Sequence, residues 1–192
     1  NLIRGEINVL RSMLAYYEGD YRRTVELTEA ALGQLGPETL YATGQASLYH
    51  IWGLQGSGEY ARAIDFSRRQ LEAYGLRANA FTLRVLLVLV NTYYEMADLP
   101  RMQESVAIFQ EMARQSELGA SLAWVHYMHG WLQYQRNELS AAEQSYRALT
   151  GMSAVAHAKA LVDGHVGLVL TALARGCPGD AVTAIATLRQ RL

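Results

Sequence analysis

The phrase Gly19-Asp20-Tyr21 decides the fold, because it returns four more times along the chain. The later copies are Gly58-Glu59-Tyr60, Ala97-Asp98-Leu99, Asn137-Glu138-Leu139 and Gly179-Asp180-Ala181, with their acidic residues spaced by 39, 39, 40 and 42 positions. A small or αL-tolerant residue closes one helix, and a carboxylate favours the N-terminus of the next. Each phrase therefore predicts a turn between two helices, and the near-constant spacing predicts a repeat.

The segments between these turns carry apolar residues at helical spacing. Further stops follow the second helix of several repeats, at Gly36-Pro37, Gly75 and Gly151. These signals predict one all-α domain over residues 1–192, built of helical pairs at about residues 2–35, 39–74, 80–117, 120–150 and 155–192. Because the first and last pairs run into the chain ends without polar capping helices, we expect the array to continue in a longer protein.

The amino-acid composition disfavours several classes of function. Hydrophobic residues make up 51% of the chain and charged residues 18%, which favours a folded domain. The formal net charge of −1 disfavours direct nucleic-acid binding by this segment. The single cysteine, Cys177, excludes an internal disulfide and fits a cytoplasmic setting. No apolar run approaches the roughly 20 residues that span a bilayer, so no contact with a membrane is expected.

The fourth pair carries the residues that suggest a family. Small Gly130 lies on its first helix, small Ala142 lies on its second helix, and aromatic Tyr146 follows. This pattern resembles the tetratricopeptide repeat, in which small residues let paired helices approach closely. The corresponding second-helix positions in the other pairs are Thr24, Ala63, Met102 and Ala184.

The period of about forty residues, together with Leu14 to Tyr21 and Gly58 to Ala63, looks like the sensor array of MalT-like, LuxR-type ATP-dependent transcriptional regulators. The resemblance implies an α-α superhelix, a right-handed solenoid of about five helical hairpins that recognises a protein or an effector. It further implies a nucleotide-binding switch domain upstream and a helix-turn-helix domain downstream, and neither lies in this sequence.

In such arrays the first helix of each pair lines a concave groove, so ligand-facing residues should recur there at helical spacing. With Gly130 setting the frame, this face carries Trp124, Tyr127, Trp131 and Tyr134 in the fourth pair, Arg84, Leu87, Asn91 and Tyr94 in the third, Glu6, Val9, Met13 and Tyr16 in the first, and Gln45 and Trp52 in the second. We predict that Arg84, Asn91, Tyr94, Trp124, Tyr127, Trp131 and Tyr134 bind a protein, a peptide or a small-molecule effector. The alternative is that the aromatic stripe packs against the neighbouring pair.

Other patterns carry less chemistry. The glycine cluster at residues 53–58 lacks the lysine and hydroxyl of a phosphate-binding loop, and His126 and His129 have no third metal ligand nearby in sequence. Cys177 has no identifiable partner base. We therefore predict no catalytic residue, no cofactor and no metal. Two hypotheses follow: a non-catalytic sensor domain of a transcriptional regulator, which would also contact the neighbouring domains of its parent, or a free-standing scaffold for partner proteins.

Overall fold

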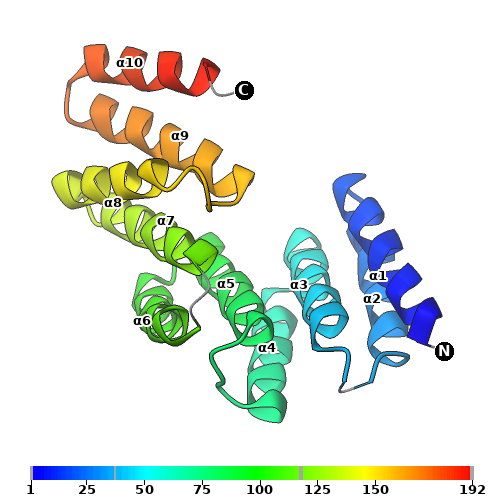
Figure 1. Ribbon diagram of the computed structural model, residues 1–192. Coiled ribbons are helices and arrows are strands. Elements are labelled where there is room, and N and C mark those ends of the chain that lie inside the picture. Colours follow the sequence, from blue (N-terminus) through cyan, green and yellow to red (C-terminus); the bar gives the residue numbers. More distant parts are fainter. Residues whose placement is uncertain (1, 37, 117–118, 191–192) are drawn as a thin grey trace. The chain divides into compact units, whose positions relative to one another are not determined.

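A computed structural model describes residues 2–36, 38–116 and 119–190, and this part of the chain holds ten α-helices and no strand (Figure 1). The helices follow one another in pairs joined by short turns, which confirms the predicted all-helical array. Pro37, one of the predicted stops, lies outside the described residues. The helices are α1 (Leu2–Tyr17), α2 (Tyr21–Leu32), α3 (Leu40–Gly56), α4 (Tyr60–Tyr74), α5 (Ala80–Glu95), α6 (Leu99–Gln115), α7 (Gly119–Gln135), α8 (Leu139–Gly151), α9 (Ala158–Ala174) and α10 (Pro178–Arg189).

The turn inside every pair has the same geometry. One residue adopts a left-handed backbone with positive φ, and the next residue donates its N–H to the carbonyl oxygen five positions earlier, as Asp20 does to Ala15 at 2.9 Å. The aspartates Asp20 and Asp98 then cap the second helix by accepting hydrogen bonds from the backbone N–H groups of Arg23 and Arg101. The left-handed residues are Gly19, Gly58, Ala97, Asn137 and Gly176.

The last turn corrects the sequence prediction. The left-handed residue is Gly176, and α10 already begins at Pro178, so Asp180 lies in the first turn of the helix. The repeat is therefore more regular than its acidic residues suggest, because the left-handed residues are spaced by 39, 39, 40 and 39 positions. The buried small residue of α10 is accordingly Ala181, three positions before the predicted Ala184.

Ala97→Gly should stabilise the protein, because alanine at φ 55° is strained and glycine is not. After the larger conformational entropy of glycine in the unfolded chain is subtracted, we expect a gain of about 0.5–1 kcal/mol in the free energy of unfolding, measured by urea denaturation. Ala107→Gly, on the exposed side of α6, is the control and should lose about 1 kcal/mol. A loss at position 97 would contradict the assigned turn.

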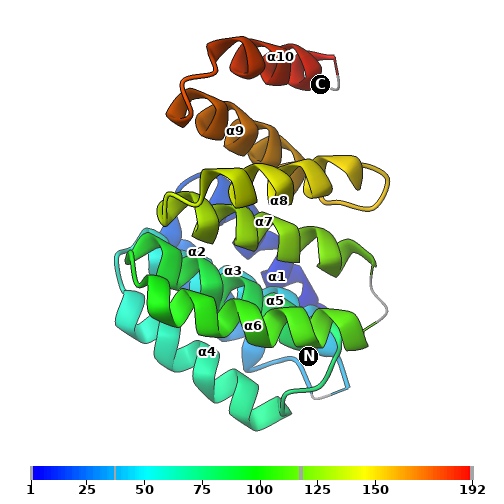
Figure 2. The ribbon, with the colours of Figure 1, turned by 90° about the vertical axis from the view of Figure 1, so that its left-hand side faces the viewer.

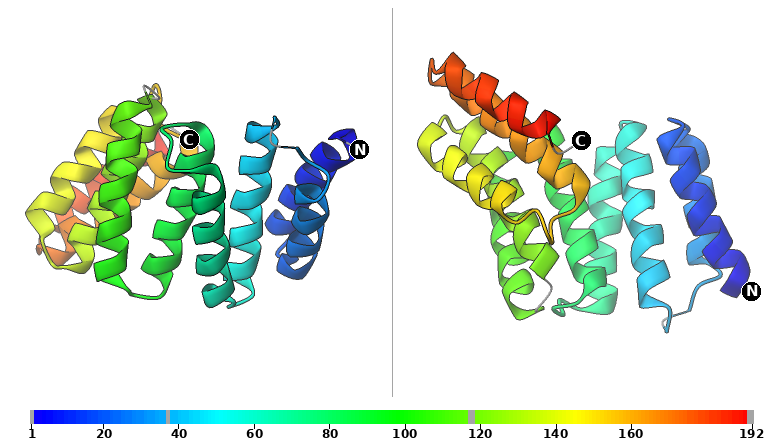
Figure 3. Two further views of the ribbon diagram at one scale, coloured as in Figure 1. Left: turned by 90° about the horizontal axis from the view of Figure 1, so that it is seen from below. Right: turned by 45° about the horizontal axis from the view of Figure 1, so that its top comes forward.

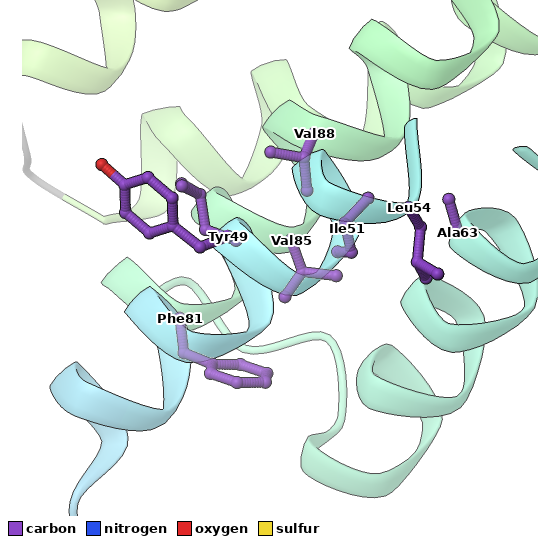
Figure 4. Close-up of a cluster of buried hydrophobic side chains, with 8 residues drawn as sticks. Tyr49, Ile51, Leu54, Ala63, Phe81, Val85 and Val88 are labelled. Carbon is purple, nitrogen blue, oxygen red and sulfur yellow. The ribbon is translucent and has the colours of Figure 1, made fainter. Parts of the chain in front are cut away.

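Helices α1 to α6 form one compact unit, which ends at Ser116. The first helices α1 and α5 each pack on α3, while α2 and α4 each pack on the first helix of their own pair and on that of the next. Figure 3 shows α1 and α2 lying side by side in this unit. Because α3 and α5 are covered from several sides, they bury residues at most positions. Ile51, Leu54, Val85 and Val88 form their shared core together with Ala63 of α4 (Figure 4).

Buried polar side chains fix the register of these helices. Gln55 on α3 donates from Nε2 to the carbonyl oxygen of Val88 at 3.0 Å and to the hydroxyl of Thr92 at 2.5 Å, both on α5. His50 on α3 shares a hydrogen bond of 2.9 Å with Thr28 on α2. Hydrogen-bonded polar groups in a core favour one arrangement of the helices over others. The register of α3 against α5 is thus specified by Gln55.

Helices α7 to α10 form the second compact unit, stacked in chain order (Figure 2). The ring of Tyr146 on α8 is buried between Gly130 on α7 and Gly167 on α9. A Cβ atom at Gly130 would lie 2.5 Å from this ring, and one at Gly167 would also overlap it. The residues that carry the tetratricopeptide resemblance therefore act as a close-packing device in this unit.

Candidate functional site

We define the first-helix face by helical geometry, as the side of α3 and α5 opposite the residues that line cavities with the second helices. It comprises Tyr41, Gln45, Leu48 and Trp52 on α3 and Arg84, Leu87, Asn91 and Glu95 on α5. At about 100° per residue, these positions lie opposite His50 and Leu54, which line a cavity with α2 and α4, and opposite Leu86, Leu89 and Tyr93, which line a cavity with α4 and α6. The two cavities thus mark the side of each helix that meets the second helices, and the first-helix face is the opposite side.

Arg84 is the cationic group of this face. Its guanidinium lies over the ring of Tyr41, with its central carbon 4.4 Å from the ring centroid, and it passes beside Gly44. Its Nη1 atom is buried and makes no hydrogen bond with any described residue, and burial lowers the pKa of the guanidinium. Tyr41 itself is 68% exposed. A positive charge is therefore partly desolvated without an anionic partner among the described residues.

Asn91 and Glu95 lie on the same stripe of α5, about two and three turns beyond Arg84. The side-chain oxygen of Asn91 is buried and accepts no hydrogen bond from a described residue. Burial raises the pKa of the Glu95 carboxyl, while a hydrogen bond with Tyr60 lowers it. Among the described residues Glu95 has no cationic partner within ion-pair distance, whereas Glu26, Glu59, Asp65 and Glu143 each pair with an arginine about one turn away. The stripe thus holds a guanidinium, which donates, an amide whose acceptor oxygen has no partner, and a carboxylate, which accepts.

An aromatic cluster borders the acidic end of the stripe. Trp52 stacks on Tyr16 with ring centroids 5.4 Å apart, and both rings contact Tyr49 edge-on. The hydroxyls of Tyr17 and Tyr49 lie 3.5 Å apart. Burial, and then the neighbouring Tyr21 and Glu95, raise the pKa of Tyr16. The face therefore carries aromatic area beside a carboxylate that has no cationic partner among the described residues.

The predicted aromatic stripe of α7 serves packing at its centre. Tyr127 is 0% exposed, its hydroxyl donates to Asp163 on α9, and its ring contacts Trp124 and Trp131. Because a ring without exposed surface offers nothing to a guest, the prediction that Tyr127 contacts a ligand is corrected. Trp124 and Trp131 are half-buried and pack on the same cluster, and Tyr134 is half-buried on α7.

The predicted site residues of the third pair lie on α5. Arg84 and Asn91 lie on the first-helix face as the helical frame predicts, and half-buried Tyr94 lies on its flank. Sequence reasoning missed Tyr41 and Glu95, although both follow the same periodicity, with Tyr41 four positions before Gln45 and Glu95 four positions after Asn91. The sequence does not show whether Arg84 and Asn91 have hydrogen-bond partners, because this depends on the neighbouring helices.

Two cavities in the described chain, both away from the first-helix face, differ in character. The cavity between α4, α5 and α6 has a volume of about 540 Å³ and a largely apolar lining, which includes Leu71, Leu76, Leu86, Leu89 and Ile108. A smaller cavity of about 210 Å³ lies between α8, α9 and α10, where Glu143 pairs with Arg147 and Arg175 across its rim. Within the described residues, no group of three or more histidine, cysteine, aspartate or glutamate side chains could hold a metal ion.

The geometry defines an all-helical repeat array with a polar stripe on its first helices. The solved structure of BtubC (BKLC) from P. vanneervenii is similar, with a TM-score of 0.69 and 16% sequence identity over 93% of this chain and 76% of that one. At this identity the similarity shows the fold alone. No family model matches the sequence, and no curated protein matches it at a significant level. Among the described residues, no helix is both long and apolar enough to span a membrane.

Proposed function

We propose that this chain is a non-catalytic recognition array whose first-helix face binds a segment of a partner protein or an effector. One observation carries the proposal: Arg84 and Asn91 lie in a single stripe of α5, and each holds a buried polar atom that makes no hydrogen bond with a described residue. Glu95, at the end of the same stripe, has no cationic partner among the described residues. Elsewhere on the surface, several charged side chains pair along their own helix.

Unpartnered polar groups that are withdrawn from water cost free energy, about 1–3 kcal/mol for a neutral group and more for a charged one. A guest that supplies the missing partners recovers this free energy on binding. Trp52 and Tyr41 add rigid aromatic area that loses little conformational entropy when a guest binds. The combination of a few oriented polar groups with aromatic area is typical of recognition surfaces.

We further propose that the array belongs to a regulator of the MalT-like, LuxR type and transmits occupancy of this face to a switch domain. The repeated turns and the period of about forty residues support this assignment. Coupling requires a guest to favour one arrangement of the array over another. The parent reading frame tests the assignment: a phosphate-binding loop upstream and a helix-turn-helix downstream support it, and their absence favours a free-standing scaffold.

Recognition itself is tested with unbiased guests. A display library of random peptides and a panel of small molecules are selected on the wild-type chain, and hits are titrated by tryptophan fluorescence. Tyr41→Ala and Asn91→Ala should weaken the hits about tenfold or more, because each removes surface or a hydrogen bond from the first-helix face. The matched control Arg69→Ala, on the exposed side of α4, should leave them unchanged. Hits that are insensitive to both face variants would sink the proposal.

A further inference from the structure

An exposed apolar stripe runs along α1, on a different helix from the first-helix face. Its members follow one another at intervals of four, three and four positions, so they share one side of the helix. All of them are exposed, Leu14 to 64%. The α1 stripe consists of Ile3, Ile7, Leu10 and Leu14. Large apolar side chains in one continuous line, unlike scattered ones, mark a surface that another protein element covers.

The later first helices show what covers this side of a first helix. In α3 and α9 the corresponding positions pack on the second helix of the preceding pair, in a register that can be counted from the left-handed residue of each turn. Positions five, nine and twelve before one turn meet positions six, nine and twelve after the preceding turn. The close contacts that define this register are Gly53 with Val25, Gly167 with Tyr146, and Gly164 with Leu149.

The junction between α4 and α5 follows the same register. The rings of Tyr74 and Phe81 lie with their centroids 4.4 Å apart. Tyr74 lies sixteen positions after left-handed Gly58, and Phe81 lies sixteen positions before left-handed Ala97. The register therefore holds at the junctions α2–α3, α4–α5 and α8–α9.

The α1 stripe occupies these same positions. Leu14, Leu10 and Ile7 lie five, nine and twelve positions before left-handed Gly19, and Ile3 lies sixteen positions before it. The stripe therefore corresponds to the side of a first helix that receives a second helix, and it is apolar at every one of the four positions.

Helix α10 carries the matching half of such a junction. Val182, Ile185 and Leu188 lie six, nine and twelve positions after left-handed Gly176. Val182 is 67% exposed, Ile185 is exposed and Leu188 is half-buried. We propose that α10 of one copy of this chain packs on the α1 stripe of a second copy. The register predicts the contacts Val182 with Leu14, Ile185 with Leu10, and Leu188 with Ile7.

The two surfaces differ from each other, and this difference determines the kind of assembly. A contact between two different surfaces is heterologous, so each added copy brings a new α1 stripe and a new α10. Copies therefore associate head to tail, and growth continues beyond a dimer unless a ring closes.

Measurements of molar mass on the intact chain test the proposal. As the concentration rises from micromolar to millimolar, the average mass of the wild type should increase about twofold or more. Leu10→Glu and Ile185→Glu should each keep the chain monomeric, because each places a charge in one half of an apolar junction. Both positions are exposed, and circular dichroism checks that each variant keeps its helices. The control Leu76→Glu, which changes an exposed leucine between α4 and α5, should associate like the wild type.

A mixture of the two variants distinguishes a head-to-tail contact from a symmetric one. Leu10→Glu retains an intact α10, and Ile185→Glu retains an intact α1 stripe. An equimolar mixture should therefore form a single junction and stop at a dimer. A symmetric contact between two α1 helices would give no such rescue.

Disulfide trapping tests the register in a Cys177→Ser background. Leu10→Cys mixed with Ile185→Cys should form a disulfide-linked dimer on oxidation, because the register places these two positions in contact. Either cysteine variant alone should remain monomeric on a non-reducing gel.

A wild-type chain that stays monomeric up to about 1 mM overturns the inference. An oligomer that Leu10→Glu disrupts and Ile185→Glu leaves intact also overturns it, because α1 then contacts a surface other than α10. Neither result bears on the proposed function, which rests on Arg84 and Asn91 of α5.

Discussion

Gly130→Ala should lower the free energy of unfolding of the α7–α10 unit by about 3 kcal/mol, because the new methyl group overlaps a buried ring. The Cβ atom would lie 2.5 Å from Cε1 of Tyr146, and that ring cannot retreat because Gly167 of α9 lies on its other side. Alanine's higher helix propensity recovers only about 1 kcal/mol. Gly167→Ala should be at least as costly, for the same reason. Urea denaturation measures both variants.

Gly151→Ala supplies the control. Gly151 also lies on a helix of this unit, and a Cβ atom there would meet nothing within 4 Å. The free energy of unfolding of the Gly151→Ala variant should therefore stay within about 1 kcal/mol of the wild type. If Gly130→Ala behaves like Gly151→Ala, the packing of Tyr146 between two first helices is wrong.

Acidification from pH 6.5 to about 4 should cost about 3 kcal/mol of stability through His50 alone. Burial between α2, α3 and α4, and then the charges of Arg62 and Arg69, lower the pKa of His50 to about 4. In the unfolded chain the imidazole takes up a proton near pH 6.5, whereas in the folded chain it stays neutral until about pH 4. The unfolded state therefore gains protons first as the pH falls, and stability is lost across this window.

The difference between two stability curves isolates this effect, since other groups titrate in the same range. His50→Gln keeps a side chain that can bond to Thr28 but cannot titrate, so its curve should be flatter than that of the wild type. His157→Gln, which alters an exposed histidine, should follow the wild-type slope. Equal slopes for the wild type and His50→Gln would contradict a neutral, buried His50.

Much of the fold follows from local chemistry in the sequence. Gly19, Gly58 and Asn137 tolerate the left-handed backbone that closes a helix, and this tolerance is visible in the residues themselves. The fifth turn was misplaced because Gly176 and Gly179 are both glycine, and only the hydrogen bond from Cys177 to Ala172 distinguishes them. The turn residues thus predict the order of the helices, but the exact start of α10 is shown only by the backbone hydrogen bonds of the structure.

The candidate site was only partly predictable, because periodicity gives the side of a helix and not what lies beside it. Helical periodicity correctly predicts that Arg84 and Asn91 lie on one side of α5. It cannot tell whether an arginine on that side has a partner. Tyr127 obeys the same frame and is buried, because Asp163 and α9 cover it. Neighbouring helices, brought together by tertiary packing, decide which positions of a stripe can meet a guest.

The most direct test of recognition by the first-helix face is an amide hydrogen-exchange footprint of the strongest guest selected on the intact chain. The account predicts protection along α3 and α5 that is lost in the Asn91→Ala variant, with the exposed backbone of α4 and α6 unaffected. Protection confined to α4 and α6, around the apolar cavity lined by Leu71, Leu76 and Ile108, would contradict it.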